Sequence, residues 1–303
     1  MTIDCTGDGD IAARAGAEFA MGREADGACQ PMTMIFTVAP FHADRHYAQM
    51  KDSDLAAARY LKAIAQARAG GELVLNPNDI FCAATYVPLP QGGIWDKPER
   101  GGLAASVNFT RVQKADATSA DELTGAEILG RKQVFEAIGF MRRAMAGFKD
   151  CELISMPAHI GIRESRRILG DYVLSGDDVQ SARPFDDVIA RGFYTLDIHN
   201  PTEVGKPSVL KQLSRPYDIP YRTLVPRSIE GLLVAGRCIS GDAVAMSSYR
   251  IQSHCMAMGQ AAGTAAALAV KAGCRPRGLD ITSLQKQLAQ DGANLGPRWR
   301  QDR

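Results

Sequence analysis

A polar segment near the C-terminal end of the chain gathers many side chains that are able to bind a ligand. Its sequence is RCISGDAVAMSSYRIQSH, and its charged, amide and imidazole groups belong to Arg237, Asp242, Arg250, Gln252 and His254. Guanidinium groups hold planar anions in a bidentate clamp. So many polar groups in one connection favour a ligand site. A connection that binds no ligand is the alternative.

His199 is the residue best suited to acid–base catalysis, because imidazole gains and loses protons near neutral pH. It ends the run RPFDDVIARGFYTLDIH. A histidine that only hydrogen-bonds the backbone is the structural alternative. Arg163 begins another charged run, which continues with Glu164, Arg166 and Arg167. Such a run is usually a solvated surface.

The sequence on either side of the polar segment predicts a strand before it and a helix after it, which would fix its position. The run 232–235, Leu-Leu-Val-Ala, ends in Gly236, which is typical of a buried strand followed by a turn. Residues 255–270 are nearly all apolar and small, so they predict a helix buried on all sides. Gln260 lies inside that run, and a buried amide needs partners. A ligand at the helix start is one interpretation, and a plain buried strand–helix pair is the other.

Several motifs resemble one family. LLVAGRCISG, SSYR and HCMAMGQAAGTAAALA resemble the C-terminal end of FAD-dependent oxidoreductases of the two-dinucleotide-binding-domain type, which are related to the flavin subunit of heterodisulfide reductases. GIRESRRILGDYVL and YDIPYRTLV resemble further segments of the same family, and IDCTGDGD resembles its element beside the FAD diphosphate. The resemblance implies an oxidoreductase that transfers hydride between a small organic substrate and the flavin of FAD.

Three residues in the family-like stretches are assigned roles by chemical argument. Hydride transfer needs a proton acceptor and a group that fixes the substrate. Arg163 and Arg250 would orient the substrate, His199 would accept or donate a proton, and the three side chains would converge. In the alternative, Arg163 and Arg250 form interdomain ion pairs with Glu164 or Asp242. The start of the helix near Cys255 would stabilise negative charge on the flavin. The implied cofactor contacts are Thr6, Gly7, Asp8, Gly236, Arg237, Gln252, Gly259, Gln260 and Ala261.

The N-terminal segment imitates a dinucleotide fingerprint, but we reject that interpretation. Gly7-x-Gly9-x-x-Ala12 has the required glycines, yet the next predicted strand, 33–38, ends in Ala39-Pro40 and offers no acidic residue for a ribose. In relatives the true G-x-G-x-x-G lies upstream of the TGDGD element. The resemblance therefore implies a chain without that N-terminal half-domain.

The predicted fold class is α/β, with an incomplete Rossmann-like FAD-binding domain and an inserted α+β cap. Residues 1–30 and 217–275 form the FAD-binding domain, 31–216 the cap or substrate domain, and 276–303 a C-terminal helix and tail. Residues 2–7 and 231–236 are predicted to be adjacent parallel strands. Further helices are predicted at 11–19, 51–69, 121–147 (capped by Ser119 or Thr118) and 280–290, and further strands at 80–87, 103–112 and 151–156.

An incomplete domain changes the functional expectation. Without the pyrophosphate loop, we expect the chain alone to bind FAD weakly or not at all. The competing hypothesis is a non-catalytic remnant, or a subunit that a partner chain completes. A homo-oligomer is also left open.

Composition bears on the remaining partners. The net charge of +1 gives no electrostatic sign of a nucleic-acid or membrane partner. The longest apolar run, 261–270, is too short to span a bilayer. The chain has seven cysteines and no C-x-x-C pair, which predicts reduced thiols and a cytoplasmic location. A 4Fe–4S cluster would follow only from family analogy, and the cysteine spacing predicts none.

Overall fold

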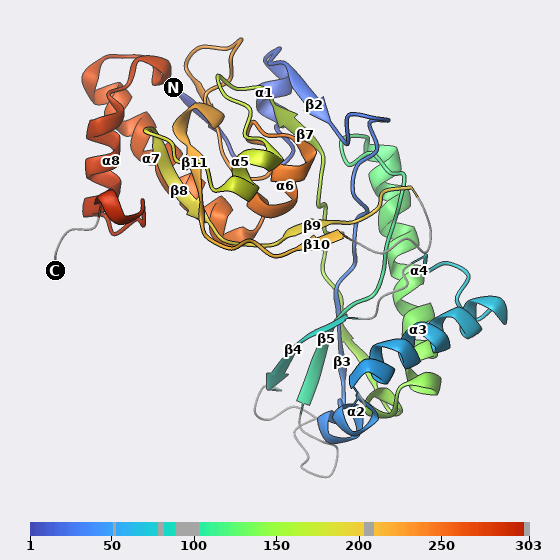
Figure 1. Cartoon of the computed structure of the whole chain (residues 1–303). Coiled ribbons are helices and arrows are strands. Elements are labelled where there is room, and N and C mark those ends of the chain that lie inside the picture. Colours follow the sequence, from blue (N-terminus) through green and yellow to red (C-terminus); the bar gives the residue numbers. More distant parts are fainter. Residues whose placement is uncertain (51–52, 78–81, 89–102, 203–208, 300–303) are drawn as a thin grey trace. The chain divides into compact units, whose positions relative to one another are not determined.

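A computed structural model describes residues 1–50, 53–77, 82–88, 103–202 and 209–299. The chain divides into two units, both drawn in Figure 1. Unit 1 consists of Met1–Gln30, Arg163–His199 and Ser208–Arg303, and unit 2 of Pro31–Ile162 and Asn200–Pro207. Each unit has its own cluster of buried apolar side chains.

A parallel pair of short strands lies at the centre of unit 1. Strands β1 (Thr2–Asp4) and β12 (Leu232–Val234) pair in register, with Ile3 opposite Leu233. This confirms the predicted adjacency of the two segments. All three residues of β12 are buried, as expected for an apolar strand in a parallel sheet.

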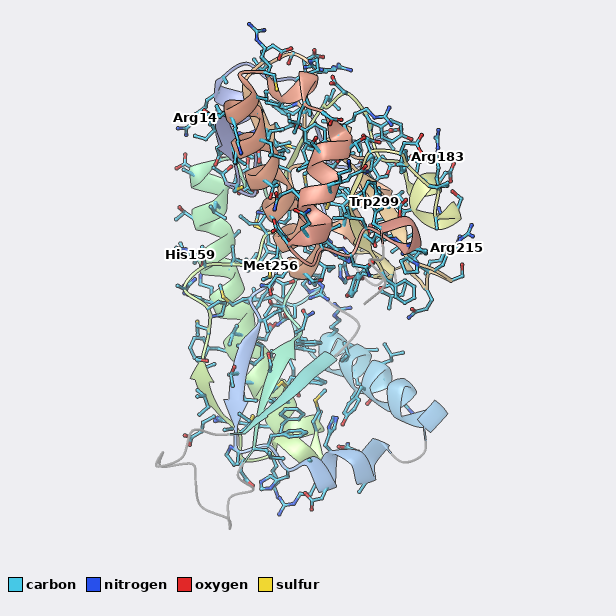
Figure 2. The ribbon with its side chains drawn as sticks, turned by 90° about the vertical axis from the view of Figure 1, so that its left-hand side faces the viewer. Arg14, His159, Arg183, Arg215, Met256 and Trp299 are labelled. Atoms are coloured by element: carbon cyan, nitrogen blue, oxygen red, sulfur yellow. The ribbon has the colours of Figure 1, made fainter. Side chains whose placement is uncertain are left out.

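Helix α7 (Gln252–Ala272) packs against β1, β12 and β8 (Val188–Gly192). Its buried residues are His254, Met258, Ala261, Ala262, Ala265 and Ala269. They lie at helical spacing and form one face. The opposite face is open, and Met256 there is 75% exposed (Figure 2). The prediction of a helix buried on all sides is therefore wrong: Gln260 is exposed, so its amide needs no buried partner.

Three antiparallel strand pairs complete the sheets of unit 1. They are β2 (Phe19–Met21) with β7 (Arg166–Ile168), β8 with β11 (Tyr217–Pro220), and β9 (Leu196–Ile198) with β10 (Val209–Lys211). These pairs explain why 163–199 belongs to unit 1, although the sequence-based division placed it in the cap. Helix α8 (Ile281–Gln290) contacts α7 and β8 and therefore also lies in unit 1.

One short helix of unit 1 was predicted but is shorter than expected, and another was not predicted. Helix α1 (Asp10–Arg14) ends well before Phe19, because Gly16 adopts a left-handed φ of 91° and turns the chain into β2. Helix α6 (Ala243–Tyr249) lies inside the segment that we expected to be a loop. Its start is fixed by Asp242, whose carboxylate accepts the Ala245 N–H at 2.6 Å. The remaining helix, α5, spans Gly176–Ser181.

Unit 2 contains an antiparallel sheet in the order β4-β5-β3-β6. Its strands are β4 (Cys82–Pro88), β5 (Leu103–Asn108), β3 (Phe36–Ala39) and β6 (Glu152–Ser155), and its helices are α2 (Ala43–Met50), α3 (Ser53–Ala69) and α4 (Ala120–Ala144). Ser119 caps α4 by accepting the Glu122 N–H. The helix ends at Ala144, and a short 3-10 turn, Ala146–Phe148, follows it.

Candidate functional site

The loop after β1 is shaped by one buried carboxylate. Asp4 is fully buried, and its Oδ1 accepts the Thr6 N–H at 2.9 Å and the Thr6 hydroxyl at 2.7 Å. Its other oxygen accepts the Ala12 N–H at 2.8 Å, so one side chain ties the strand to α1. Gly7, with a φ of 85°, adopts the left-handed conformation that favours glycine.

Arg237 links this loop to the turn that follows β12. Its Nη1 lies 3.0 Å from Oδ1 of Asp8, and a Cβ built on Gly7 would lie 2.7 Å from its guanidinium. Asp8 also accepts a hydrogen bond from the Ser165 hydroxyl. The neighbouring Gly236 has a φ of 99°, and a Cβ added there would meet no heavy atom within 4 Å. Two glycine turns and one arginine therefore meet at the ends of β1 and β12.

The start of α7 lies near the same arginine. Burial raises the pKa of the Cys255 thiol, and the positive charge of Arg237 opposes that rise. Ile251 precedes the helix and provides no side-chain cap. The first N–H groups of a long helix carry partial positive charge. Arg237 and the helix start could both contact an anionic group, although the charge of Arg237 is already compensated by Asp8.

The predicted cofactor residues do not all lie in this region. Thr6, Gly7, Asp8, Gly236 and Arg237 come together around the ends of β1 and β12, and Gln252 is the first residue of α7. The other three, Gly259, Gln260 and Ala261, lie roughly 10–14 Å further along α7, at a rise of about 1.5 Å per residue.

Asp197, on β9, brings the predicted catalytic residues together. Its Oδ2 lies 3.2 Å from Nε2 of His199 and 3.3 Å from a guanidinium nitrogen of Arg250. Arg250 also donates to the Asp197 carbonyl at 3.1 Å. Burial raises the pKa of Asp197, but the His199 hydrogen bond and the charges of His199, Arg250 and Arg163 outweigh it, so the pKa lies below its usual value. Arg163 thus acts on the same carboxylate.

The charges of this cluster are largely shielded from solvent. The Arg250 side chain is 8% exposed, and burial lowers its pKa, while Asp197 opposes that change. Among the described residues, the acidic partner of Arg250 is Asp197 and neither Glu164 nor Asp242. Asp242 caps α6 instead and accepts the Gly176 N–H at 2.8 Å.

The charged run after Arg163 is not a solvated surface. Arg167 and Glu164 form an ion pair with side chains 3% and 2% exposed. Arg167 also donates to the carbonyls of Gly241 and Gly22, at 2.9 and 2.7 Å. Burial raises the pKa of Glu164, although hydrogen bonds and nearby arginines oppose the rise. These bonds join β7 to the turn before α6.

Gln30 joins this buried pair to His199. Its backbone N–H donates to Glu164 at 2.9 Å, and its side-chain carbonyl accepts the backbone N–H of His199 at 3.0 Å. Sequence reasoning missed both Asp197 and Gln30. A signal for Asp197 was present, because residues two apart on a strand share a face and the chain reads Asp-Ile-His.

His254, in the polar segment, has a structural role. Its Nδ1 lies 3.2 Å from the Ser248 carbonyl and its Nε2 accepts the Phe193 N–H at 3.2 Å. Burial lowers its pKa, although the Ser248 contact opposes the change. The neutral imidazole thus joins α7 to the end of β8.

The described residues contain neither a membrane-spanning helix nor a metal centre. None of the described helices combines the length and apolar character needed to cross a membrane. Within the same residues, no three histidine, cysteine or acidic side chains lie close enough together to hold a metal ion.

Comparison with known proteins places this geometry in a family. The family model described as FAD dependent oxidoreductase matches residues 1–288. Neither the curated proteins nor the solved structures gave a match. The mixture of helices and small sheets in unit 1 is consistent with an α/β FAD-binding fold. The chain belongs to the FAD dependent oxidoreductase family.

Proposed function

We propose that this chain oxidises a small organic acid that carries a hydroxyl or amino group beside the reacting C–H. The observation that carries the proposal is the meeting of His199 and Arg250 at one carboxylate oxygen of Asp197. Such a reaction needs a proton acceptor and a cation that fixes the substrate. Both are present in one buried cluster of unit 1, with Arg163 close by.

The loops of unit 1 fit a flavin. FAD, when bound, supplies the group that accepts the hydride. Gly236 allows a close approach to backbone, whereas the space at Gly7 is taken by Arg237. Arg237 with the start of α7 would face the flavin edge that becomes negative on reduction. Thr6 and Asp8 would lie at its diphosphate side, as the family resemblance implies.

His199 takes the proton in this proposal. The Asp197 carboxylate accepts a hydrogen bond from His199 and orients its imidazole. Oxidation then breaks one C–H and one O–H or N–H bond of the substrate. His199 would take the proton of the O–H or N–H bond, and bound FAD would supply the acceptor for the hydride. Asp197 stabilises the imidazolium that results.

Arg250 and Arg163 would hold the substrate carboxylate. A guanidinium with little solvent around it binds an anion more strongly than an exposed one. Asp197 keeps the Arg250 head group in place through its carboxylate and its carbonyl. This arrangement favours 2-hydroxy or 2-amino carboxylates as substrates.

The chain alone is proposed to bind FAD weakly. Among the described strands, β1 has β12 as its neighbour on one side, and parallel sheets are normally covered and wider. A further strand, supplied by a partner chain or a second copy, would complete the sheet and the cofactor site. The alternative to an enzyme is a non-catalytic subunit with the same fold.

The chain is also proposed to hold no iron–sulfur cluster. Such clusters need closely grouped thiolates. The seven cysteines include no C-x-x-C pair, and the proposal rests on that spacing.

An FAD titration followed by flavin fluorescence tests the cofactor site. We expect saturable but weak binding, with the flavin lost on gel filtration, and about tenfold weaker binding in Arg237→Gln. Arg14→Gln is the control, because Arg14 is an exposed arginine of α1 (Figure 2). Equal affinities of the two variants would contradict the site, and stoichiometric FAD after gel filtration would contradict the weak binding.

A screen of 2-hydroxy and 2-amino acids tests the reaction. A substrate would bleach the absorbance of the FAD-loaded chain under anaerobic conditions. In Arg250→Lys we expect at least about a tenfold loss of kcat/KM, because lysine lacks the bidentate fork. An unchanged kcat/KM in this variant would assign Arg250 to structure, and bleaching by none of the acids would favour the non-catalytic alternative.

A further inference from the structure

Unit 2 contains a cavity of about 450 Å³. Small-molecule sites commonly have volumes of roughly 300–1,000 Å³. It lies between the end of α3, the loop 73–77, helix α4 and the chain after β5. Its lining includes Arg68, Leu75, Arg111, Lys114, Leu129 and Gln133. None of these residues belongs to the flavin-side loops or the Asp197 cluster.

Buried polar side chains fix the walls of this cavity. Gln133 is 1% exposed; its amide donates to the carbonyls of Leu75 and Arg111 at 2.8 Å and accepts the Arg111 N–H at 2.9 Å. Asn76, also 1% exposed, donates to the Gln133 carbonyl at 2.9 Å. One helix residue thus holds two separate wall segments, and the cavity is formed before any ligand arrives.

A carboxylate on α4 fixes the loop further. Glu136 accepts the N–H groups of Val74, Leu75 and Asn76 at 2.6–2.9 Å. It is not part of the lining itself. The loop therefore keeps a defined shape, although Val74 is 74% exposed. A loop held so firmly offers a rigid rim to a small molecule.

Basic residues give this cavity its electrostatic character. Arg68, Arg111 and Lys114 line it, and no acidic residue does so among the described residues. Arg68 is held by two bonds to the Asn76 carbonyl, at 2.8 and 3.2 Å. Lys114 has a φ of 56°, which is costly for a residue with a side chain. Arg111 is 7% exposed, and its guanidinium donates to Asn108 and to the Thr110 carbonyl, both at 2.7 Å. The positive charge of these three lining residues suits a negatively charged ligand.

Apolar side chains occupy much of the remaining lining. Leu73, Leu75 and Leu129 line the cavity together with Val74 and Pro77. Val74 and Leu75 expose 74% and 38% of their surface, so a bound apolar group would remove them from water. A phosphate ion has no apolar group that could contact these apolar side chains.

We propose that this cavity, built from residues of unit 2, binds a small carboxylate with an apolar body. The basic wall holds the carboxylate, and the leucine side and the rim at Val74 cover the body. Binding needs neither FAD nor the substrate of the proposed oxidation, so the test does not depend on that proposal.

Calorimetric titration of the full chain with phenylacetate tests the site. We expect one saturable site with a Kd of about 0.1–1 mM, the range for a ligand of this size. Lys114→Asn should weaken binding by about threefold to tenfold. Asparagine tolerates the left-handed backbone, so this variant should fold. Gln113→Glu, which places a negative charge in the lining, should have at least as large an effect.

Matched controls separate this site from general attraction. Lys149→Asn removes the same charge at an exposed position outside the lining and should leave the Kd unchanged. Phenylacetamide, which lacks the charge, and inorganic phosphate, which lacks the apolar body, should each bind at least about tenfold more weakly. No saturable binding of phenylacetate, equal binding of either probe, or no effect of the two lining variants would overturn the proposal.

Discussion

At the scale of single residues, the candidate site depends on a carboxylate that sequence reasoning did not select. Arg163, His199 and Arg250 were chosen for their own chemistry, and each is a cation or becomes one. Cations repel one another unless an anion lies among them. Asp197 supplies that anion from β9, two residues before His199. Its partner Arg250 lies far away in the sequence, and only the fold brings it near.

Replacing Asp197 by asparagine tests this account through stability. Its pKa is lower in the folded chain than the usual value. The folded state therefore binds fewer protons, so the stabilisation is complete above the unfolded pKa, near pH 4, and is lost as the pH falls through the folded pKa. Asp197→Asn should cost roughly 2–4 kcal/mol at pH 7 because it leaves Arg250 buried without its anion.

Urea unfolding at pH 7 and at pH 3 measures both the loss of stability in Asp197→Asn and the change in its pH dependence. The variant should lose part of the pH dependence that the unchanged chain shows. Asp177→Asn, at an exposed position of α5, is the control and should stay within about 0.5 kcal/mol. A similar pH dependence in Asp197→Asn would mean that Asp197 does not hold the cluster together.

At the scale of elements, local sequence signals predicted where a helix or strand lies along the chain better than which of its faces is buried. The strand Leu232 to Val234 was predicted from its short apolar run before a glycine. Its pairing with β1 was predicted from the family resemblance. α7 was predicted, but its exposed face was not. A helix of small residues has no polar stripe to mark the side that faces solvent. The short α6 was missed because Asp242 was interpreted as a ligand-binding group and not as a cap.

The turn after β2 gives a prediction at this scale. Gly22 has a φ of 62°, and a Cβ there would lie 2.0 Å from the Gly27 carbonyl oxygen. Gly16 has a φ of 91° with no atom within 4 Å of such a Cβ. Gly16→Ala should therefore cost only the left-handed backbone strain, about 1–2 kcal/mol. Gly22→Ala should cost roughly 2 kcal/mol more, because backbone must move as well.

Denaturant unfolding of both variants provides the comparison. The Gly22 carbonyl also accepts a bond from the buried Arg167, so a shift of this turn would weaken that bond as well. Equal losses in the two variants would contradict the prediction and show that the turn adapts to the added Cβ.

At the scale of the whole molecule, the sequence indicated two parts but divided them differently. Motif resemblance predicted that the chain returns to the FAD-binding domain at 217, whereas the structure has the chain return to unit 1 at Arg163. The reason is long-range pairing: β7 joins β2, and β8 joins β11, across large separations in sequence. No local pattern records which strand another will pair with, so this boundary required the fold.

Each of the two units has its own hydrophobic core, so their stabilities can be tested separately. Leu233 and Met141 are both 0% exposed, the first in the core of unit 1 and the second in that of unit 2. Truncating either to alanine removes buried apolar surface and leaves a cavity, which costs about 2–5 kcal/mol. If each unit unfolds as a cooperative body, the two losses act on different transitions.

Differential scanning calorimetry shows whether the two units unfold separately or together. Leu233→Ala should lower the transition of unit 1, and Met141→Ala that of unit 2, each by several degrees. Added FAD should raise the transition that Leu233→Ala lowers, because ligand binding stabilises the body that holds the site. Phenylacetate should raise the other transition. A single transition that both variants lower equally would mean that the units unfold together. FAD acting on the transition that Met141→Ala lowers would place the cofactor in unit 2 and contradict the site described for unit 1.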